Sequence, residues 1–176
     1  MSWYPHTVTV PAAAEPVSLA QAKAQCRVDG EANDSAIQGY IAAARAYVEA
    51  YCGTPLASQT VPVKCDDFRD FEKFPLVPLT SVSSVSYIDT AGTAQTLSTS
   101  IYEVRTDGLT ASLQLKYAQS WPLIQSGSRI TVTAVVGYAS VDEAILHAML
   151  LLISQWYDIR QGVSDRSVTE VPHAVD

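Results

Sequence analysis

Cysteine and charged residues are both scarce in this sequence. The three cysteines, Cys26, Cys52 and Cys65, are too few and too scattered for a disulfide framework, and no two of them have the CxxC spacing of a zinc site. A reducing compartment is therefore expected. Charged residues make up 16% of the chain and hydrophobic residues 48%, a balance typical of a globular rather than a disordered chain.

Long apolar runs and basic clusters are also missing. The longest uninterrupted apolar run, residues 148–153, is far too short to span a bilayer, and the first residues lack the features of a signal peptide. No membrane partner is expected. The chain has 11 Lys and Arg residues against 18 Asp and Glu residues, which gives a formal net charge of −7. This balance argues against a groove that grips nucleic acid, although DNA can pass along such a surface.

Motifs of catalysis and cofactor binding do not occur. The histidines, His6, His147 and His173, show no HExxH or HxH spacing, and the sequence has no GxSxG elbow and no glycine-rich phosphate loop. His147 lies in a mostly apolar helical segment, where a packed histidine is more common than a metal ligand. We therefore expect no enzyme activity, no catalytic residue, no cofactor and no metal site.

The densest group of ionisable residues is the stretch CDDFRDFEKF at residues 65–74. Two interpretations of it remain open. Grouped carboxylates can hold a divalent cation, which would make residues 66–72 a small metal-binding module. Alternatively, the stretch is a solvated loop whose three phenylalanines, Phe68, Phe71 and Phe74, point inward. We favour the loop, because the spacing does not match that of a calcium-binding loop.

Proline divides the beginning of the chain from the rest. Pro5, Pro11 and Pro16 predict an extended arm over residues 1–17, because proline fixes φ and removes a backbone donor. A domain is expected over residues 18–161, followed by a tail over residues 162–176 without helical or strand periodicity. Valine is frequent in that tail, which suits a segment that becomes ordered on a partner.

Three helices are predicted, over about residues 18–29, 34–52 and 140–161. The first opens with the capping-box pair Ser18 and Gln21, and the third with the pair Ser140 and Glu143. The third helix is apolar on almost every side, so we expect it to be buried all round. The second helix and the sheet would cover most of it, and its last turn would meet another chain.

Between residues 60 and 138, threonine, serine and valine become frequent, and apolar residues alternate with polar ones. The segments LQLKY and RITVTAVV show this period of two, and TAG near Gly92 is typical of a hairpin turn. These signals predict several antiparallel strands. The order of helix, helix, strands and helix predicts an α+β fold with segregated elements.

The order of these signals resembles the head–tail connector family, also described as adaptor or head-completion proteins, of long-tailed phages and related prophage or gene-transfer particles. Three pieces carry the resemblance: SLAQAK followed by RVDG, the strand pattern PLTSVSSVSYIDTAG, and GYASVDEAILHAMLLLISQWYDIR. Their occurrence in this order makes the match specific. The resemblance covers about residues 17–162.

The resemblance implies a small bundle of three main helices with an inserted antiparallel β region. It also implies a structural subunit of the virion neck, assembled in the host cytoplasm, that forms a homo-oligomeric ring of typically twelve copies beneath the portal protein. Such a ring extends the channel through which DNA passes without specific binding, and it carries stopper or tail-terminator proteins. Another neck protein, such as a stopper or a tail-completion protein, is the alternative.

In this family the last helix and the tail dock on the portal. On this chain the corresponding region is about residues 156–176. We expect the partner contact to be made by Trp156, Tyr157, Ile159, Arg160, Val163, Arg166, Val168, Val171 and Pro172. The resemblance implies no catalytic, cofactor-binding or metal-binding residue.

Overall fold

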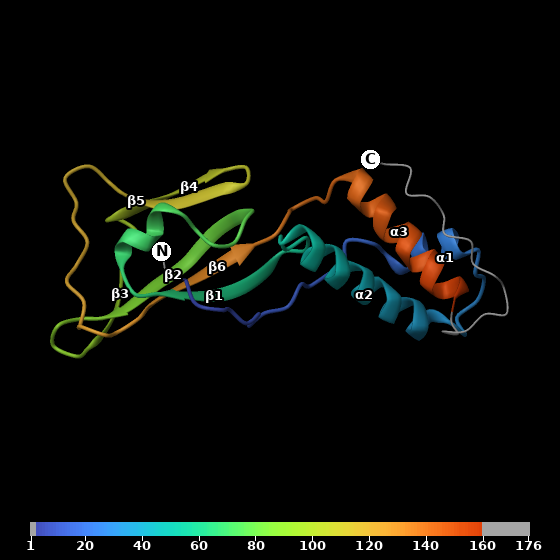
Figure 1. The fold of residues 1–176 in the computed structure, drawn as a ribbon, viewed down its shortest axis with the longest axis horizontal. Coiled ribbons are helices and arrows are strands. Elements are labelled where there is room, and N and C mark those ends of the chain that lie inside the picture. The colour runs from blue at the N-terminus through green and yellow to red at the C-terminus, as the bar shows by residue number, and fades with distance from the viewer. Residues whose placement is uncertain (1–2, 160–176) are drawn as a thin grey trace.

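The computed structural model describes residues 3–159, and it places strands at one end of a long molecule and helices at the other (Figure 1). Along these residues, two helices are followed by six strands and a last helix, with one short 3₁₀ helix among the strands. We call the two ends the helical half and the β half. No helix of the described residues is both long and apolar enough to cross a membrane.

The helical half contains α1 (Leu19–Cys26), α2 (Asp34–Cys52) and α3 (Glu143–Asp158). The capping box predicted for α1 is confirmed. Ser18 Oγ accepts a hydrogen bond from the Gln21 backbone N–H, and the Gln21 side chain accepts one from the Ser18 N–H. Arg27 then adopts a left-handed conformation, which ends α1 earlier than the sequence pattern suggests.

The N-cap predicted for α3 is wrong. Asp142, and not Ser140, caps this helix, because its Oδ1 accepts a hydrogen bond from the Ala144 N–H at 2.8 Å. The chain before Asp142 is still held against the α2–β1 connection, since the Tyr138 N–H donates to the Leu56 carbonyl at 3.1 Å. Helical geometry therefore starts only once the chain has left that contact.

All three helices contribute to one buried core, made of Val17, Ala22, Ile37, Ile41, Ala44, Leu56, Met149 and Ile153. The expectation that α3 is buried all round is wrong. Its buried residues are Met149 and Ile153, whereas Leu151 on the opposite side is 51% exposed. One apolar face of α3 thus remains uncovered in the single subunit.

The β half contains six antiparallel strands: β1 (Gln59–Cys65), β2 (Leu79–Ile88), β3 (Ala94–Thr96), β4 (Tyr102–Asp107), β5 (Thr110–Leu115) and β6 (Ile130–Val136). One sheet has the strand order β1-β6-β2-β3, and β4 and β5 form a second, two-stranded sheet. The hairpin turn predicted near Gly92 is confirmed, because it joins β2 to β3 and Gly92 has a φ of 80°.

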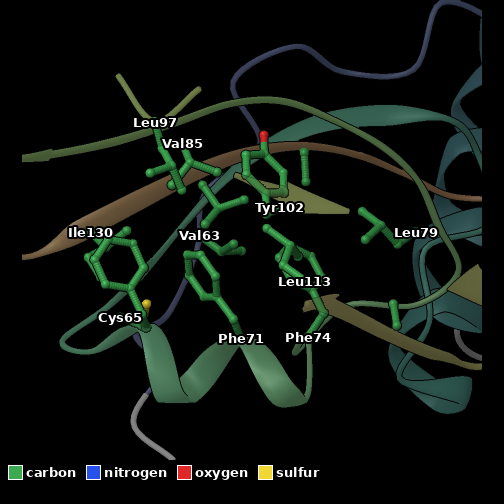
Figure 2. Packing of buried hydrophobic residues seen from close by; sticks show 14 of the residues in the cluster. Val63, Cys65, Phe71, Phe74, Leu79, Val85, Leu97, Tyr102, Leu113 and Ile130 are labelled. Atoms are coloured by element: carbon green, nitrogen blue, oxygen red, sulfur yellow. The ribbon is translucent and has the colours of Figure 1, made fainter. Parts of the chain in front are cut away.

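The core of the β half lies between the two sheets and the 3₁₀ helix η1 (Phe68–Glu72). Figure 2 shows Phe71, Tyr102 and Leu113 pointing into this space. Phe68, Phe71 and Phe74 are 5%, 0% and 3% exposed, so the prediction that these rings point inward is confirmed. Strand β6 contributes to the same core by alternation, because every second residue from Ile130 to Val136 is fully buried.

The predicted fold class, a small helical bundle carrying an inserted β region, is wrong. Six strands in two sheets, together with η1, enclose a core of their own, and more of the described residues are buried in that core than in the helical one. The β half is therefore the larger packed unit and not a minor insertion in a helical bundle. The sequence pattern identified strands but gave no measure of how much they would bury together.

The N-terminal arm runs along the outer edge of β1 and covers it (Figure 1). The Tyr4 N–H donates to the Lys64 carbonyl at 2.9 Å, and Val10 and Thr60 exchange hydrogen bonds of 3.0 and 3.3 Å between their backbones. Between these points β1 carries Pro62, which has no N–H to offer. The arm and this proline together leave β1 with little free edge for unwanted pairing.

Candidate assembly surfaces

The last turn of α3 carries the first of the predicted partner contacts. The Trp156 indole is half-buried and meets the Tyr47 ring edge-on, with ring centroids 6.1 Å apart. Tyr157 is also half-buried against the helical core, whereas Ile159 is 49% exposed. Trp156 and Tyr157 therefore belong in part to the subunit's own packing, and Ile159 offers the most open apolar surface of the three.

The remaining predicted contacts lie outside the described residues. They are Arg160, Val163, Arg166, Val168, Val171 and Pro172. The interface expected for them stays a prediction.

An aromatic anchor holds the start of the arm on the β half. The Trp3 ring stacks on Phe71 at 6.1 Å and meets Phe74 edge-on at 5.3 Å, and its indole N–H donates to the Lys73 carbonyl at 3.0 Å. Next to it, the Tyr4 hydroxyl lies 2.9 and 3.0 Å from the two carboxylate oxygens of Asp66. These contacts give the arm a fixed end on the far side of the molecule from the helices.

The chain crosses between the two halves three times, at residues 11–17, 53–58 and 137–142, and we call this region the waist. Glu49 of α2 fastens it: its carboxylate accepts from Arg45 at 2.8 Å and from the Leu56 backbone N–H at 2.8 Å. Arg45 also donates to Glu15 of the arm at 2.7 Å, and this hydrogen bond raises the pKa of Arg45 above its ordinary value. One network thus ties all but the last crossing to α2.

Gly137 secures the last crossing. Its N–H donates to the Pro78 carbonyl at 3.0 Å, and its own carbonyl accepts from the Thr80 hydroxyl at 3.2 Å. Gly137 has a φ of 109°, and a Cβ at this position would lie 2.3 Å from the Ala57 carbonyl oxygen. Only glycine allows the β6–α3 connection and the α2–β1 connection to approach each other this closely.

Sequence reasoning left the arm without a role and missed the waist network. The spacing of Arg45 and Glu49, four residues apart in one helix, was the available signal for an ion pair. Nothing local in the sequence indicates that Glu15 joins them from 30 residues away.

The acidic stretch 66–72 contributes to local structure in three different ways. Asp67 Oδ1 accepts from the Arg69 N–H at 2.9 Å and so caps η1, Asp66 bonds the Tyr4 hydroxyl, and Asp70 is only 7% exposed. Within residues 3–159, no group of three or more His, Cys, Asp or Glu side chains is placed to hold a metal ion. The geometry therefore does not favour a metal-binding module here.

An open hollow of about 610 Å³ lies between residues 72–77 and the β4–β5 hairpin. Its lining mixes apolar side chains such as Trp3, Phe74 and Leu109 with charged ones such as Arg105 and Asp107, and contains neither histidine nor cysteine. His147, for its part, is exposed on α3 and not packed as the sequence pattern suggested. We assign no catalytic role to either place.

The thiols should differ sharply in reactivity. Cys65 is fully buried, and burial raises the pKa of its thiol from 9.0 to about 12, whereas Cys52 is exposed. We expect a disulfide reagent at pH 8 to label Cys52 rapidly and Cys65 only after unfolding, because the thiolate is the reactive form. Peptide mass spectrometry of native and urea-treated protein checks this, with Cys52→Ser as the control.

The raised pKa of Cys65 also makes the stability of the protein depend on pH. Below about pH 9 the Cys65 thiol is protonated in both the folded and the unfolded protein, so burying the neutral thiol contributes fully to the free energy of unfolding. As pH rises from 9 towards 12, the unfolded chain loses this proton first, and that contribution is lost. Rapid labelling of Cys65 in the native protein at pH 8 would contradict this description of the core.

Most of this chain matches a family of known proteins. The sequence model of a family described as phage gp6-like head-tail connector protein matches residues 16–176, which include both halves and the waist except for residues 11–15. Among curated proteins, none matches this chain.

Solved structures share the fold. A chain in the neck of an empty GTA particle, computed with C6 symmetry, superposes with a TM-score of 0.76 at 19% identity, covering 92% of this chain and 87% of that one. A chain in the virion of a native gene transfer agent particle gives 0.75 at 20% identity, covering 92% and 88%. A chain in the neck of a native GTA particle, computed with C12 symmetry, gives 0.65 at 21% identity, covering 94% and 88%.

These matches span both cores and not an isolated motif. Because the family model covers nearly the whole chain, the protein belongs to the phage gp6-like head–tail connector family.

Proposed function

We propose that this chain is a structural subunit of the neck of a phage-like particle, where copies of it form a ring that joins the DNA-filled head to the tail proteins. The observation that carries the proposal is the family match over residues 16–176. The similar folds come from particle necks reconstructed with C6 and C12 symmetry, which supports a ring, and the C12 symmetry supports twelve copies in it. A role without catalysis is consistent with the surfaces described above.

The shape of the subunit suits a connecting role. Its two halves lie at opposite ends of a long axis, and one consists of helices while the other consists of strands (Figure 1). A ring of such subunits has two unlike rims, so one rim can contact the portal protein and the other a stopper or tail-terminator protein. The waist network around Glu49 would keep the two rims at a fixed separation.

The charge of the subunit suits a DNA channel. Each copy carries a formal net charge of −7, so a ring of copies does not attract the phosphate backbone strongly. DNA would then pass through the lumen without specific binding. A neck reconstruction in which Lys and Arg side chains line the lumen would count against this part of the proposal.

Portal binding by the end of the chain is the part most directly tested. We expect deletion of residues 163–176 to weaken capture by the portal protein at least tenfold, since the predicted tail contacts are lost. Capture of the full-length and truncated chains on immobilised portal protein measures this. The truncated chain should keep its melting temperature, because all residues of the two described cores come before Asp158.

Two results would contradict the proposal in different ways. Equal capture of both chains would show that the tail is not the portal contact. Absence of the chain from the neck, in electron cryomicroscopy of purified particles, would overturn the connector role itself. Capture by a tail-completion protein in place of the portal would favour the alternative neck role.

A further inference from the structure

The outer face of α2 carries no charged side chain over five turns. Its exposed residues are Ser35, Ala36, Gly39, Ala43, Ala46 and Ala50, and the exposed Tyr47 and Tyr51 border it on the side where Tyr47 meets Trp156 of α3. After Asp34, the charged residues of α2 are Arg45 and Glu49, and both are turned into the waist network. A surface helix normally places its charges on the side that faces water, so this arrangement is unusual.

The outer face of α3 shows the same lack of charge. Between Glu143 and Asp158 the helix contains no Asp, Glu, Lys or Arg, and the exposed residues there are Ala144, His147, Ala148, Leu151 and Gln155. In a chain with a net charge of −7, these two faces stand out. Large apolar side chains are exposed on or beside these faces: Leu151 of α3 is 51% exposed, and Tyr47 and Tyr51, which border the α2 face, are 55% and 84% exposed.

The two faces point away from each other. Ile37 and Ile41 of α2 and Met149 and Ile153 of α3 are buried in the same core, so the opposite sides of the two helices look outward in different directions. Figure 1 shows how α2 and α3 lie next to each other in the helical half. Contacts that close a ring are head-to-tail and need two different surfaces on each subunit, which these faces supply.

The two faces carry side chains of different size, which suits packing of one against the other. The exposed side chains of the α2 face are small, mostly alanine with Gly39 among them, and the larger Tyr47 and Tyr51 lie beside them. On α3, the exposed Leu151 is larger than Ala148 and Ala144, which lie one and two turns before it on the same face. Helices pack by placing ridges of side chains into grooves, and small residues allow the helix axes to come close.

We propose that the outer face of α2 on one subunit packs against the outer face of α3 on the next subunit, and that this repeated contact closes the ring. The inference rests on the proposed function, and it names the surfaces that build the ring. The partner is a second copy of this chain for an electrostatic reason. Acidic copies repel one another wherever charged surfaces meet, and these uncharged helix faces let them approach without that cost.

A single charge placed on the α2 face tests the proposal. Ala43→Glu puts a carboxylate near the middle of the α2 face, at a position that is exposed in the monomer. We expect the variant to fold with a melting temperature within about 2 °C of the wild type, in line with a surface change. Its incorporation into the neck, measured in particles with full-length chain, should fall at least tenfold.

Controls separate the proposed face from a general effect of charge. Ala94→Glu makes the same change at an exposed position of β3 in the β half, and it should be incorporated like the wild type. The double variant Ala43→Glu with Ala148→Lys places opposite charges on the two faces that meet, and it should regain most of the lost incorporation. Normal incorporation of Ala43→Glu would overturn the inference while leaving the connector role intact.

Cross-linking gives a second and independent readout. In a Cys52→Ser background, cysteines at Ala43 and Ala148 should form disulfides between neighbouring subunits, seen as a ladder of multimers from oxidised particles on a non-reducing gel. The pair at Ala43 and Ala94 should give monomers. A ladder supports the proposed contact, and monomers from both pairs overturn it. If the wild-type chain is absent from the neck, the connector role fails and the inference fails with it.

Discussion

Replacing Gly137 by alanine is expected to lower the free energy of unfolding by about 3 kcal/mol or more. Two effects add at this position. A residue with a side chain is strained at a φ of 109°, and the new methyl carbon would lie 2.3 Å from the Ala57 carbonyl oxygen and 2.6 Å from its carbon. The obstacle is backbone and not a flexible side chain, so it cannot move aside without opening the waist.

Relief of that clash would cost other contacts. Separating Gly137 from Ala57 would pull on the hydrogen bond from the Tyr138 N–H to Leu56, and on the one from the Gly137 N–H to Pro78. Both halves of the molecule meet at these bonds. We therefore expect the variant to lose stability in both halves and not in one alone.

Urea unfolding at constant temperature measures the effect of Gly137→Ala. Gly39→Ala is a suitable control, because Gly39 lies inside α2 with no atom within 4 Å of the added Cβ. That change should raise stability by about 0.5–1 kcal/mol, since alanine favours the helix. A Gly137→Ala protein as stable as the wild type would show that the close approach at the waist is not required.

Phe71→Ala is expected to cost roughly 3–5 kcal/mol in the β half, the usual range for removing a buried aromatic ring. Phe71 is fully buried, and three further rings pack on it. Trp3 stacks on it at 6.1 Å, and Phe68 and Trp121 meet it edge-on at 5.4 Å each. The ring therefore joins the arm, η1 and the loop before β6, and its removal leaves a cavity among side chains that cannot all close in.

The tryptophans allow the effect of Phe71→Ala to be located. Trp3 and Trp121 pack in the β half, and Trp156 in the helical half, whose unfolding also appears in the helical circular dichroism signal. Fluorescence from the first two should change at lower urea concentration than in the wild type. Tyr117→Ala, at a side chain that is 99% exposed, should change stability by less than about 0.5 kcal/mol. A similarly small loss for Phe71→Ala would contradict the packing in Figure 2.

Features that depend on neighbouring residues could be predicted from the sequence. The Ser18 and Gln21 pair, the turn at Gly92 and the inward phenylalanines all follow from short spacings, because the interacting groups are close along the chain. A cap, a turn or an alternating strand needs little information from elsewhere. Competition between two nearby cap residues is harder, and Asp142 prevails over Ser140 because contacts at the waist delay the start of α3.

Features that depend on distant residues could not be predicted in the same way. The relative size of the two cores follows from how six strands pair, and local alternation does not state that pairing. An apolar helix also does not reveal how many neighbours it has, which explains why α3 was expected to be buried on every side. The structure leaves Leu151 in the open instead.

The same limit applies to the candidate assembly surfaces. Sequence reasoning placed the partner contact at the end of α3, where Trp156 turns out to share its packing with Tyr47 of α2. The α2 face was not recognised, because alanines in a helix are compatible with almost any environment. Their meaning depends on knowing that Arg45 and Glu49 point elsewhere, and this requires Glu15 and Leu56 to be in place.

The positions of Trp3 and of the end of α3 have a practical consequence for imaging. Residue 3 is anchored in the β half, whereas α3 finishes at the far end of the helical half (Figure 1). Two small labels, one before Trp3 and one after Asp158, would therefore mark opposite poles of every subunit. In particle images too coarse to resolve helices, such labels would report which pole faces the capsid and which faces outward.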